Sequence, residues 1–214
     1  MTQLGFDDLL SQTETDNEAH ALKRKYPDLP ASWDTALPYY QNLLQRCDAA
    51  FLTADVDAIN RIYGEAEALA TILQGKTSGL LAPDGAGTIL AEKTRAPAGT
   101  TPLWGQEGEF IIEAAGVAVR METDGIFGIS TRYVLLPGFA AHAVDFDKPF
   151  ISETGFRSFI GYGADVEPGV TIEAFAKALI EHHVSRALKG RLVAIDDKYR
   201  LRAKAAPGLE VEGV

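Results

Sequence analysis

Apolar side chains recur every three or four residues in two consecutive segments of the first third of the chain. This spacing places the apolar residues of each segment on one face of a helix. The turn-forming residues Thr53-Ala54-Asp55 lie between the two segments, and so short a connection favours an antiparallel pair. We therefore predict a helical hairpin over residues 31–78. Its apolar stripes are Tyr40, Leu43, Leu44, Cys47, Ala50 and Phe51 in the first helix, and Ile59, Ile62, Tyr63, Ala66, Leu69, Ala70 and Leu73 in the second.

From Phe110 onward the apolar residues fall instead into short runs, which are separated by Gly116, Asp124-Gly125 and Pro137-Gly138. Glycine, proline and aspartate are typical turn residues, so this pattern predicts a central antiparallel β-meander. The Asp124-Gly125 pair is the strongest hairpin signal in the chain. The predicted strands are 110–112, 117–121, 126–129, 133–136 and 139–144.

A long C-terminal helix is predicted after a loop over residues 145–169. Thr171 can cap this helix, apolar residues from Ile172 to Ala187 share one face, and Gly190 marks its end. We expect the helix to pack on the sheet. Hairpin, meander and C-terminal helix together predict an α+β fold in which helices cover one face of an antiparallel sheet.

Composition divides the chain into five segments. Residues 1–30 are rich in charge and poor in large apolar groups, so we expect a flexible or weakly helical arm. The hairpin at 31–78 is followed by a linker-like loop at 79–109, which is rich in Gly, Pro and Thr. The meander and C-terminal helix occupy 110–205, and 206–214 form a tail. A chain of 214 residues is also compatible with one compact domain over 31–205.

The chain is acidic, with a formal net charge of -10. Such a charge repels phosphate backbones and anionic membrane surfaces, so neither a nucleic acid nor a membrane is an expected partner. Nucleic-acid binding would need a local basic patch. The best candidate is a C-terminal stretch, which we interpret first as a solvated helix and tail; its cations are Lys189, Arg191, Lys198, Arg200, Arg202 and Lys204.

The chain holds a single cysteine, Cys47, so no intrachain disulfide can form and a disulfide-stapled secreted fold is excluded. No run of about 18 apolar residues occurs. We therefore expect a cytoplasmic protein. Common hydrolase and zinc signatures, such as Gly-x-Ser-x-Gly, His-Glu-x-x-His and Cys-x-x-Cys, are missing, and we expect no cofactor and no metal ion.

The densest polar cluster lies between the last predicted strand and the loop that follows. Two carboxylates, Asp145 and Asp147, could hold a divalent cation beside His142, which could also transfer protons. The interpretation that we favour is simpler: the two aspartates make turn and capping hydrogen bonds before Pro149.

A second group in the same loop consists of Glu153, Arg157 and Ser158. The planar guanidinium of Arg157 suits a carboxylate or a phosphate, and Gly155 lets the backbone approach a ligand. The alternative is a loop clamped to the fold by a Glu153–Arg157 ion pair. The candidate ligand-binding residues are therefore His142, Asp145, Asp147, Glu153, Arg157 and Ser158.

The segment His142–Phe159, with the sequence HAVDFDKPFISETGFRSF, resembles a segment of uncharacterised proteins from proteobacterial plasmids and other mobile elements. The resemblance covers the last third of the chain. It implies a bacterial accessory protein and carries no activity or catalytic residue with it.

Function is not determined by these patterns, and two hypotheses stay open. The first is a non-enzymatic bacterial accessory or binding protein that engages a protein partner or a small anionic ligand, and that could form a homodimer through the helical hairpin. The alternative is an enzyme, hydrolase-like or nucleic-acid-modifying, with a site around residues 142–158.

Overall fold

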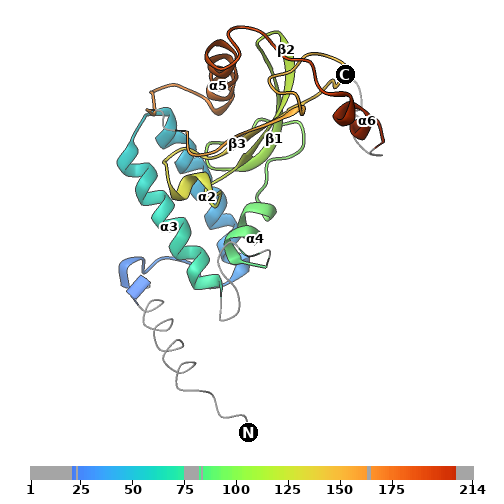
Figure 1. The fold of residues 1–214 in the computed structure, drawn as a ribbon. Helices are drawn as coiled ribbons and strands as arrows, with labels where there is room; N and C mark the ends of the chain where they lie inside the picture. Colours follow the sequence, from blue (N-terminus) through green and yellow to red (C-terminus); the bar gives the residue numbers. More distant parts are fainter. Residues whose placement is uncertain (1–20, 23, 75–81, 83, 163–164, 206–214) are drawn as a thin grey trace, which may run out of the picture.

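The computed structural model describes residues 21–22, 24–74, 82, 84–162 and 165–205. Residues 1–20 and 23 of the predicted arm at 1–30, and the predicted tail at 206–214, lie outside the described residues. Within the described part, a pair of helices, a four-stranded antiparallel sheet and a C-terminal helix follow one another (Figure 1). This order confirms the predicted α+β class.

The helical hairpin consists of α2 (Trp33–Leu52) and α3 (Val56–Gln74). The connection between them is short, and Ala54 in it adopts a positive φ of 53°. The Asp55 carboxylate accepts a hydrogen bond of 2.9 Å from the Ala58 backbone N–H, which caps the start of α3. The apolar stripes of both helices are buried, as their spacing predicted, except that Tyr63 and Leu73 of α3 are half-buried.

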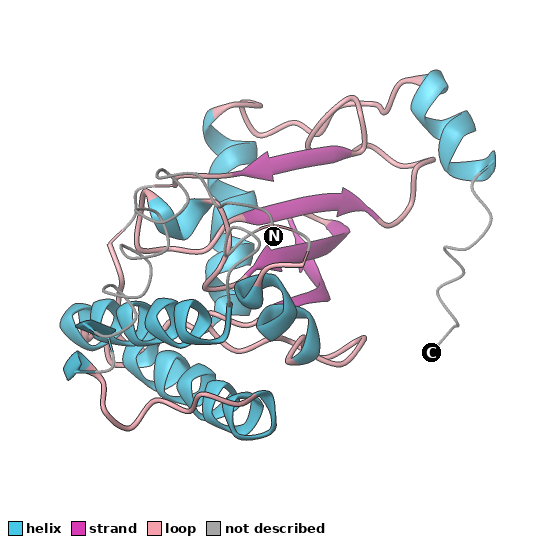
Figure 2. Cartoon of the chain, turned by 90° about the horizontal axis from the view of Figure 1, so that it is seen from below, coloured by secondary structure: helices cyan, strands magenta, loops and turns pink. Residues whose placement is uncertain are grey.

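The sheet is a meander of β1 (Glu107–Ala114), β2 (Val117–Asp124), β3 (Phe139–Ala143) and β4 (Phe156–Phe159). The strands lie in chain order and each neighbouring pair is antiparallel (Figure 2). The predicted meander is confirmed, although one predicted turn and two predicted strands differ from the structure.

The tight hairpin turn is Ala115-Gly116, where both residues have positive φ (51° and 81°), and not Asp124-Gly125. Two such residues in succession match the twist of adjacent strands. Asp124 instead ends β2, and the chain then takes a long path to β3. The predicted strands 126–129 and 133–136 are wrong, because this path contains turns and the 3-10 helix η1 (Ser130–Arg132). The fourth strand comes from 156–159, which the pattern had left in a loop.

The C-terminal helix α5 (Ile172–Arg186) packs on one face of the sheet, the inner face, which the pleat also assigns to Phe110, Met121, Phe139 and Phe159. Phe175 of α5 lies 5.7 Å from Phe139 and His183 lies 5.6 Å from Phe159, measured between ring centres. As predicted, the Thr171 side chain caps α5 by accepting a hydrogen bond from the Ala174 N–H.

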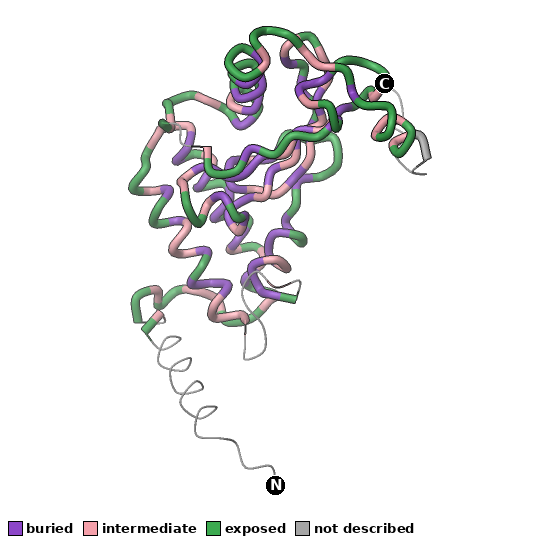
Figure 3. The backbone as a smooth tube through the Cα atoms, viewed as in Figure 1, coloured by how far each residue is buried: buried purple, intermediate pink, exposed green. Residues whose placement is uncertain are grey.

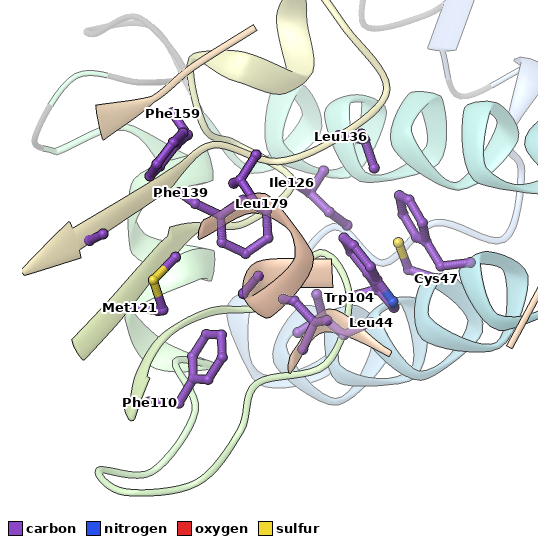
Figure 4. Close-up of a cluster of buried hydrophobic side chains, with 14 of the residues drawn as sticks. Leu44, Cys47, Trp104, Phe110, Met121, Ile126, Leu136, Phe139, Phe159 and Leu179 are labelled. Carbon is purple, nitrogen blue, oxygen red and sulfur yellow. The ribbon is translucent and has the colours of Figure 1, made fainter. Parts of the chain in front are cut away.

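The segment expected to be a linker, 79–109, differs from that expectation where the structure describes it. It contains the short helix α4 (Ala86–Lys93) and Trp104, which is only 2% exposed. The indole stacks on Phe51 at 4.5 Å and donates a hydrogen bond of 3.0 Å to the Val170 carbonyl. Figure 4 shows this indole between side chains from the hairpin and from the sheet. Trp104 therefore joins hairpin and sheet in one core, a role that the local Gly and Pro content conceals.

The last helix, α6 (Asp197–Ala205), lies on the side of the molecule away from the hairpin (Figure 1, Figure 2). Buried segments gather between the hairpin, the sheet and α5, whereas α6 is exposed over much of its length (Figure 3). No described helix is both long and apolar enough to cross a membrane.

Candidate functional site

The sheet separates the residues that the sequence proposed as one site. His142 and Ser158 lie on the outer face, which faces away from α5, because they pair with Arg120 and Ala140 in the strand register. Arg157 pairs with Ala141 and lies on the inner face, where its guanidinium is 5.9 Å from the centre of the Phe159 ring.

The inner-face group around Arg157 also includes His183 of α5. Burial lowers the pKa of His183, and the nearby Arg157 charge lowers it further. Arg157 forms no ion pair with Glu153 among the described residues, so the loop is not clamped in the way that the sequence suggested. The guanidinium is exposed at the edge of the sheet.

The acidic residues of the 144–155 loop serve turns and chain anchoring. The Asp145 carboxylate accepts a hydrogen bond of 2.9 Å from the Asp147 N–H and lies 3.4 Å from the Lys148 ammonium. Asp147 lies close enough to Arg200 of α6 to interact with its charge. The Glu153 carbonyl accepts a hydrogen bond of 2.9 Å from the Asp196 N–H. Much of this loop therefore holds the chain segment that leads into α6.

A ladder of alternating charges crosses the outer face of the sheet. Arg95, just after α4, forms ion pairs of 2.7 Å with both Glu107 and Glu109 of β1. Arg120 of β2 continues the ladder, at 2.8 Å from the Glu109 carboxylate and 3.4 Å from Glu122. Such partly exposed pairs contribute little stability each, but together they fix the side chains of this face.

The ladder ends at His142 of β3. Its Nε2 lies 3.3 Å from the Glu122 carboxylate, and this buried atom has no hydrogen-bond partner among the described residues. The imidazole also packs against Phe156 of β4, with 5.0 Å between the ring centres. Of the predicted residues, His142 thus joins a charge network, although one that extends away from Asp145 and Asp147.

A pocket of about 580 Å³ opens at the other end of the outer face, between α4 and the sheet. Four carboxylates line it against one guanidinium, that of Arg95. Its apolar wall includes two isoleucines that remain largely exposed, Ile129 at 59% and Ile160 at 56%. The four acidic residues are Glu107, Glu109, Glu122 and Asp124.

Two of these carboxylates are partly withdrawn from water. Burial raises the pKa of Glu107; Arg95 opposes this effect, while Glu92, Asp124 and Glu109 add to it by repulsion. Burial also raises the pKa of Asp124, and backbone N–H groups, with Gly138 first among them, oppose that effect. The Gly138 N–H donates a hydrogen bond of 2.6 Å to the Asp124 carboxylate. The pocket therefore carries excess negative charge that a cationic group would offset.

Two glycines, Gly128 and Gly138, leave room for the Asp124 carboxylate. A side-chain carbon at Gly128 would overlap the Asp124 carboxylate, and one at Gly138 would lie 2.7 Å from its oxygen. Asp124 thus fixes the loop between β2 and β3, where Ile129 reaches the pocket. Among the described residues, no group of three or more His, Cys, Asp or Glu is arranged to hold a metal ion.

Sequence reasoning missed the residues of this pocket, although a signal for them exists. Charged residues alternate with apolar ones along Glu107–Ala114 and Val117–Asp124, which places them on one face of a strand pair. Arg95 had no such signal, because only the fold brings the end of α4 to the sheet.

Residues 107–189, from β1 to just beyond α5, match the family model of the KlcB third domain. The chain is similar to two proteins named Protein KlcB from Escherichia coli. One is 33% identical over 183 residues, or 84% of this chain, and the other is 37% identical over 105 residues, or 47% of this chain. These matches support the resemblance to uncharacterised bacterial mobile-element proteins, and neither name specifies an activity.

The chain spans less than half the length of these relatives, 43% of the first and 21% of the second. The matched domain contains the whole sheet and α5, so it includes the outer face but not the hairpin. No solved structure matches the chain.

Proposed function

We propose that this chain is a non-enzymatic bacterial binding module, whose outer sheet face recognises a positively charged segment of a protein partner. The observation that carries the proposal is the pocket beside α4, where four carboxylates beneath an apolar rim face two guanidinium groups, those of Arg95 and Arg120. Lysine and arginine side chains suit such a site, because their aliphatic stems cover apolar surface while their charged heads reach the carboxylates.

Charge and exposed apolar area support a protein partner over a small cation. The net charge of -10 attracts a basic partner over distances of about 10 Å at moderate salt, which accelerates encounter. Ile129 and Ile160 on the rim are 59% and 56% exposed, so burial of the remaining area by a partner would contribute about 1–2 kcal/mol each. A basic peptide with interspersed apolar residues offers both contacts.

The enzyme hypothesis has less support. The six residues proposed from the sequence are divided between the outer face, the inner face and a turn-forming loop, and a catalytic site requires groups that converge on one reacting atom. Groups on opposite faces of a sheet do not converge in this way.

Peptide binding measured by fluorescence anisotropy tests the proposal. The probe is a labelled dodecapeptide of alternating Lys and Leu, and its matched partner carries Glu in place of Lys. We expect the basic peptide to bind with an affinity that falls with salt, and Glu109→Gln to weaken it by about tenfold, or about 1.4 kcal/mol. Glu113→Gln, on the same face but outside the pocket, serves as the control. Equal binding of the acidic peptide, or equal loss in the Glu113 variant, would refute the proposal.

A small anionic ligand at Arg157 is the second candidate. The exposed guanidinium, beside the Phe159 ring and in no ion pair among the described residues, favours it. Titration with inorganic phosphate and acetate, followed by NMR shifts of the backbone amides of β4, tests it. Shifts that disappear in Arg157→Lys, which keeps the charge but loses the planar fork, would support this site.

A further inference from the structure

The helix α6 carries a basic surface that nothing in the described chain covers. On α6 and the residue before it, three cations, Lys198, Arg200 and Arg202, accompany two carboxylates, Asp196 and Asp197, and Leu201 is 68% exposed. Lys198 lies 3.5 Å from Asp196, and Arg200 pairs with Asp197 and interacts with Asp147, whereas Arg202 forms no ion pair among the described residues. The exposed cations of this helix suit a negatively charged partner surface.

Two faces can be distinguished on α6. Tyr199 and Ala203 are spaced by four residues and are both half-buried, and Tyr199 packs against the core. Lys198, Leu201 and Arg202 follow the spacing i, i+3 and i+4, so they share an outward face on which all three are exposed. This outward face places one apolar side chain between cations.

The acidic pocket beside α4 is the complement of this face. Its four carboxylates exceed the two guanidinium groups that pair with them, those of Arg95 and Arg120, and its exposed isoleucines match the exposed leucine of the helix. Both charge and apolar character therefore agree, and both surfaces belong to the same chain.

The helix cannot reach this pocket within its own chain while it keeps its anchors. The segment leading into α6 is attached to the loop that joins β3 to β4. Val193 pairs with Phe150 of this loop, and the Asp196 N–H donates a hydrogen bond to the Glu153 carbonyl. The pocket lies at the other end of these strands, beside Phe139 and Ile160. The anchors of α6 and the pocket lie near opposite ends of β3. At about 3.3 Å per residue, the length of this strand separates them by roughly 15 Å.

We propose that two copies of the chain associate reciprocally, each placing the outward face of α6 in the acidic pocket of the other. This inference rests on the proposed function, and it names the basic segment that the pocket binds. An exchange of this kind is closed by a two-fold axis, because the same two surfaces meet twice. The contact depends on salt, since it joins opposite charges at the molecular surface.

Complementary charge reversal in analytical ultracentrifugation tests the proposal. We expect a dimer for the unmodified chain at low salt, and a monomer for both Arg202→Glu and Glu122→Lys. When the two variants are mixed, each acidic helix faces a basic pocket and each basic helix faces an acidic pocket, so a mixed dimer should return. Arg186→Glu, at the end of α5 and outside both surfaces, should leave the dimer unchanged.

A second pocket variant guards against loss of folding, because Glu122 contacts both Arg120 and His142. Ile129→Lys adds a positive charge to the rim without removing a partner, and it should dissociate the dimer by itself. A monomeric unmodified chain would overturn the inference, while binding of the Lys-Leu peptide would then still sustain the proposed function. A dimer that survives all three variants would place the interface elsewhere and would equally overturn it.

Discussion

The Asp124 carboxylate fits into the space beside Gly128, and a substitution at Gly128 tests what this fit contributes to stability. Gly128 has no side chain, and a side-chain carbon there would occupy the position of the carboxylate. In Gly128→Ala the carboxylate must therefore move and lose the 2.6 Å hydrogen bond from the Gly138 N–H. Hydrogen bonds to charged groups contribute about 1.5–3 kcal/mol, so we expect the free energy of unfolding to fall by about 2–3 kcal/mol.

Urea denaturation followed by circular dichroism and tryptophan fluorescence measures this change. For a chain of about this size, a loss of 2–3 kcal/mol corresponds to a fall in melting temperature of about 4–12 °C. The loop that carries Ile129 loses its anchor at the same time. Binding of the Lys-Leu peptide should weaken in parallel, because this loop forms part of the pocket rim.

A double-mutant cycle separates this mechanism from a general intolerance of alanine at position 128. Asp124→Ala removes the same hydrogen bond and should cost a similar amount. Because the clash is then absent, adding Gly128→Ala to Asp124→Ala should change the free energy of unfolding by less than about 0.5 kcal/mol. Additive costs in the double variant would refute the reasoning.

Three further outcomes follow from the structure. Burial raises the pKa of Asp124 and Glu107, so the folded state keeps these protons to higher pH than the unfolded state does. The stability that the two groups contribute is therefore present at low pH and falls as the pH rises through the folded pKa values. Asp124→Asn combined with Glu107→Gln should flatten this pH dependence in urea denaturation between pH 4 and 7. Ala115→Asn gives the Asn-Gly turn that two successive positive φ angles favour, and should raise the unfolding free energy by about 0.5–1 kcal/mol in the same assay. Trp104→Ala removes the buried indole between the hairpin and the sheet, and should lower the free energy of unfolding by about 3–5 kcal/mol. A change near zero would show that the segment 96–106 is not part of the core.

Elements with a strong periodic pattern were predictable from sequence. The stripes of the hairpin and the Thr171 cap of α5 depend on neighbours within one helix, so their local spacing was sufficient. The path from Asp124 to Phe139 was not predictable. There the Asp-Gly signal gave way to a carboxylate that bonds to Gly138, fourteen residues further along. A local turn rule cannot include a partner at that distance.

The sequence by itself determined the α+β class, the hairpin, the C-terminal helix and the net negative charge. Only the tertiary structure decided which polar residues share a surface. It placed Arg157 on the inner face and His142 on the outer face, and it brought Arg95 to Glu107 and Glu109. The physical reason is that helix and strand periodicity are set by neighbouring residues, whereas a binding surface is set by strand register and by the packing of distant segments.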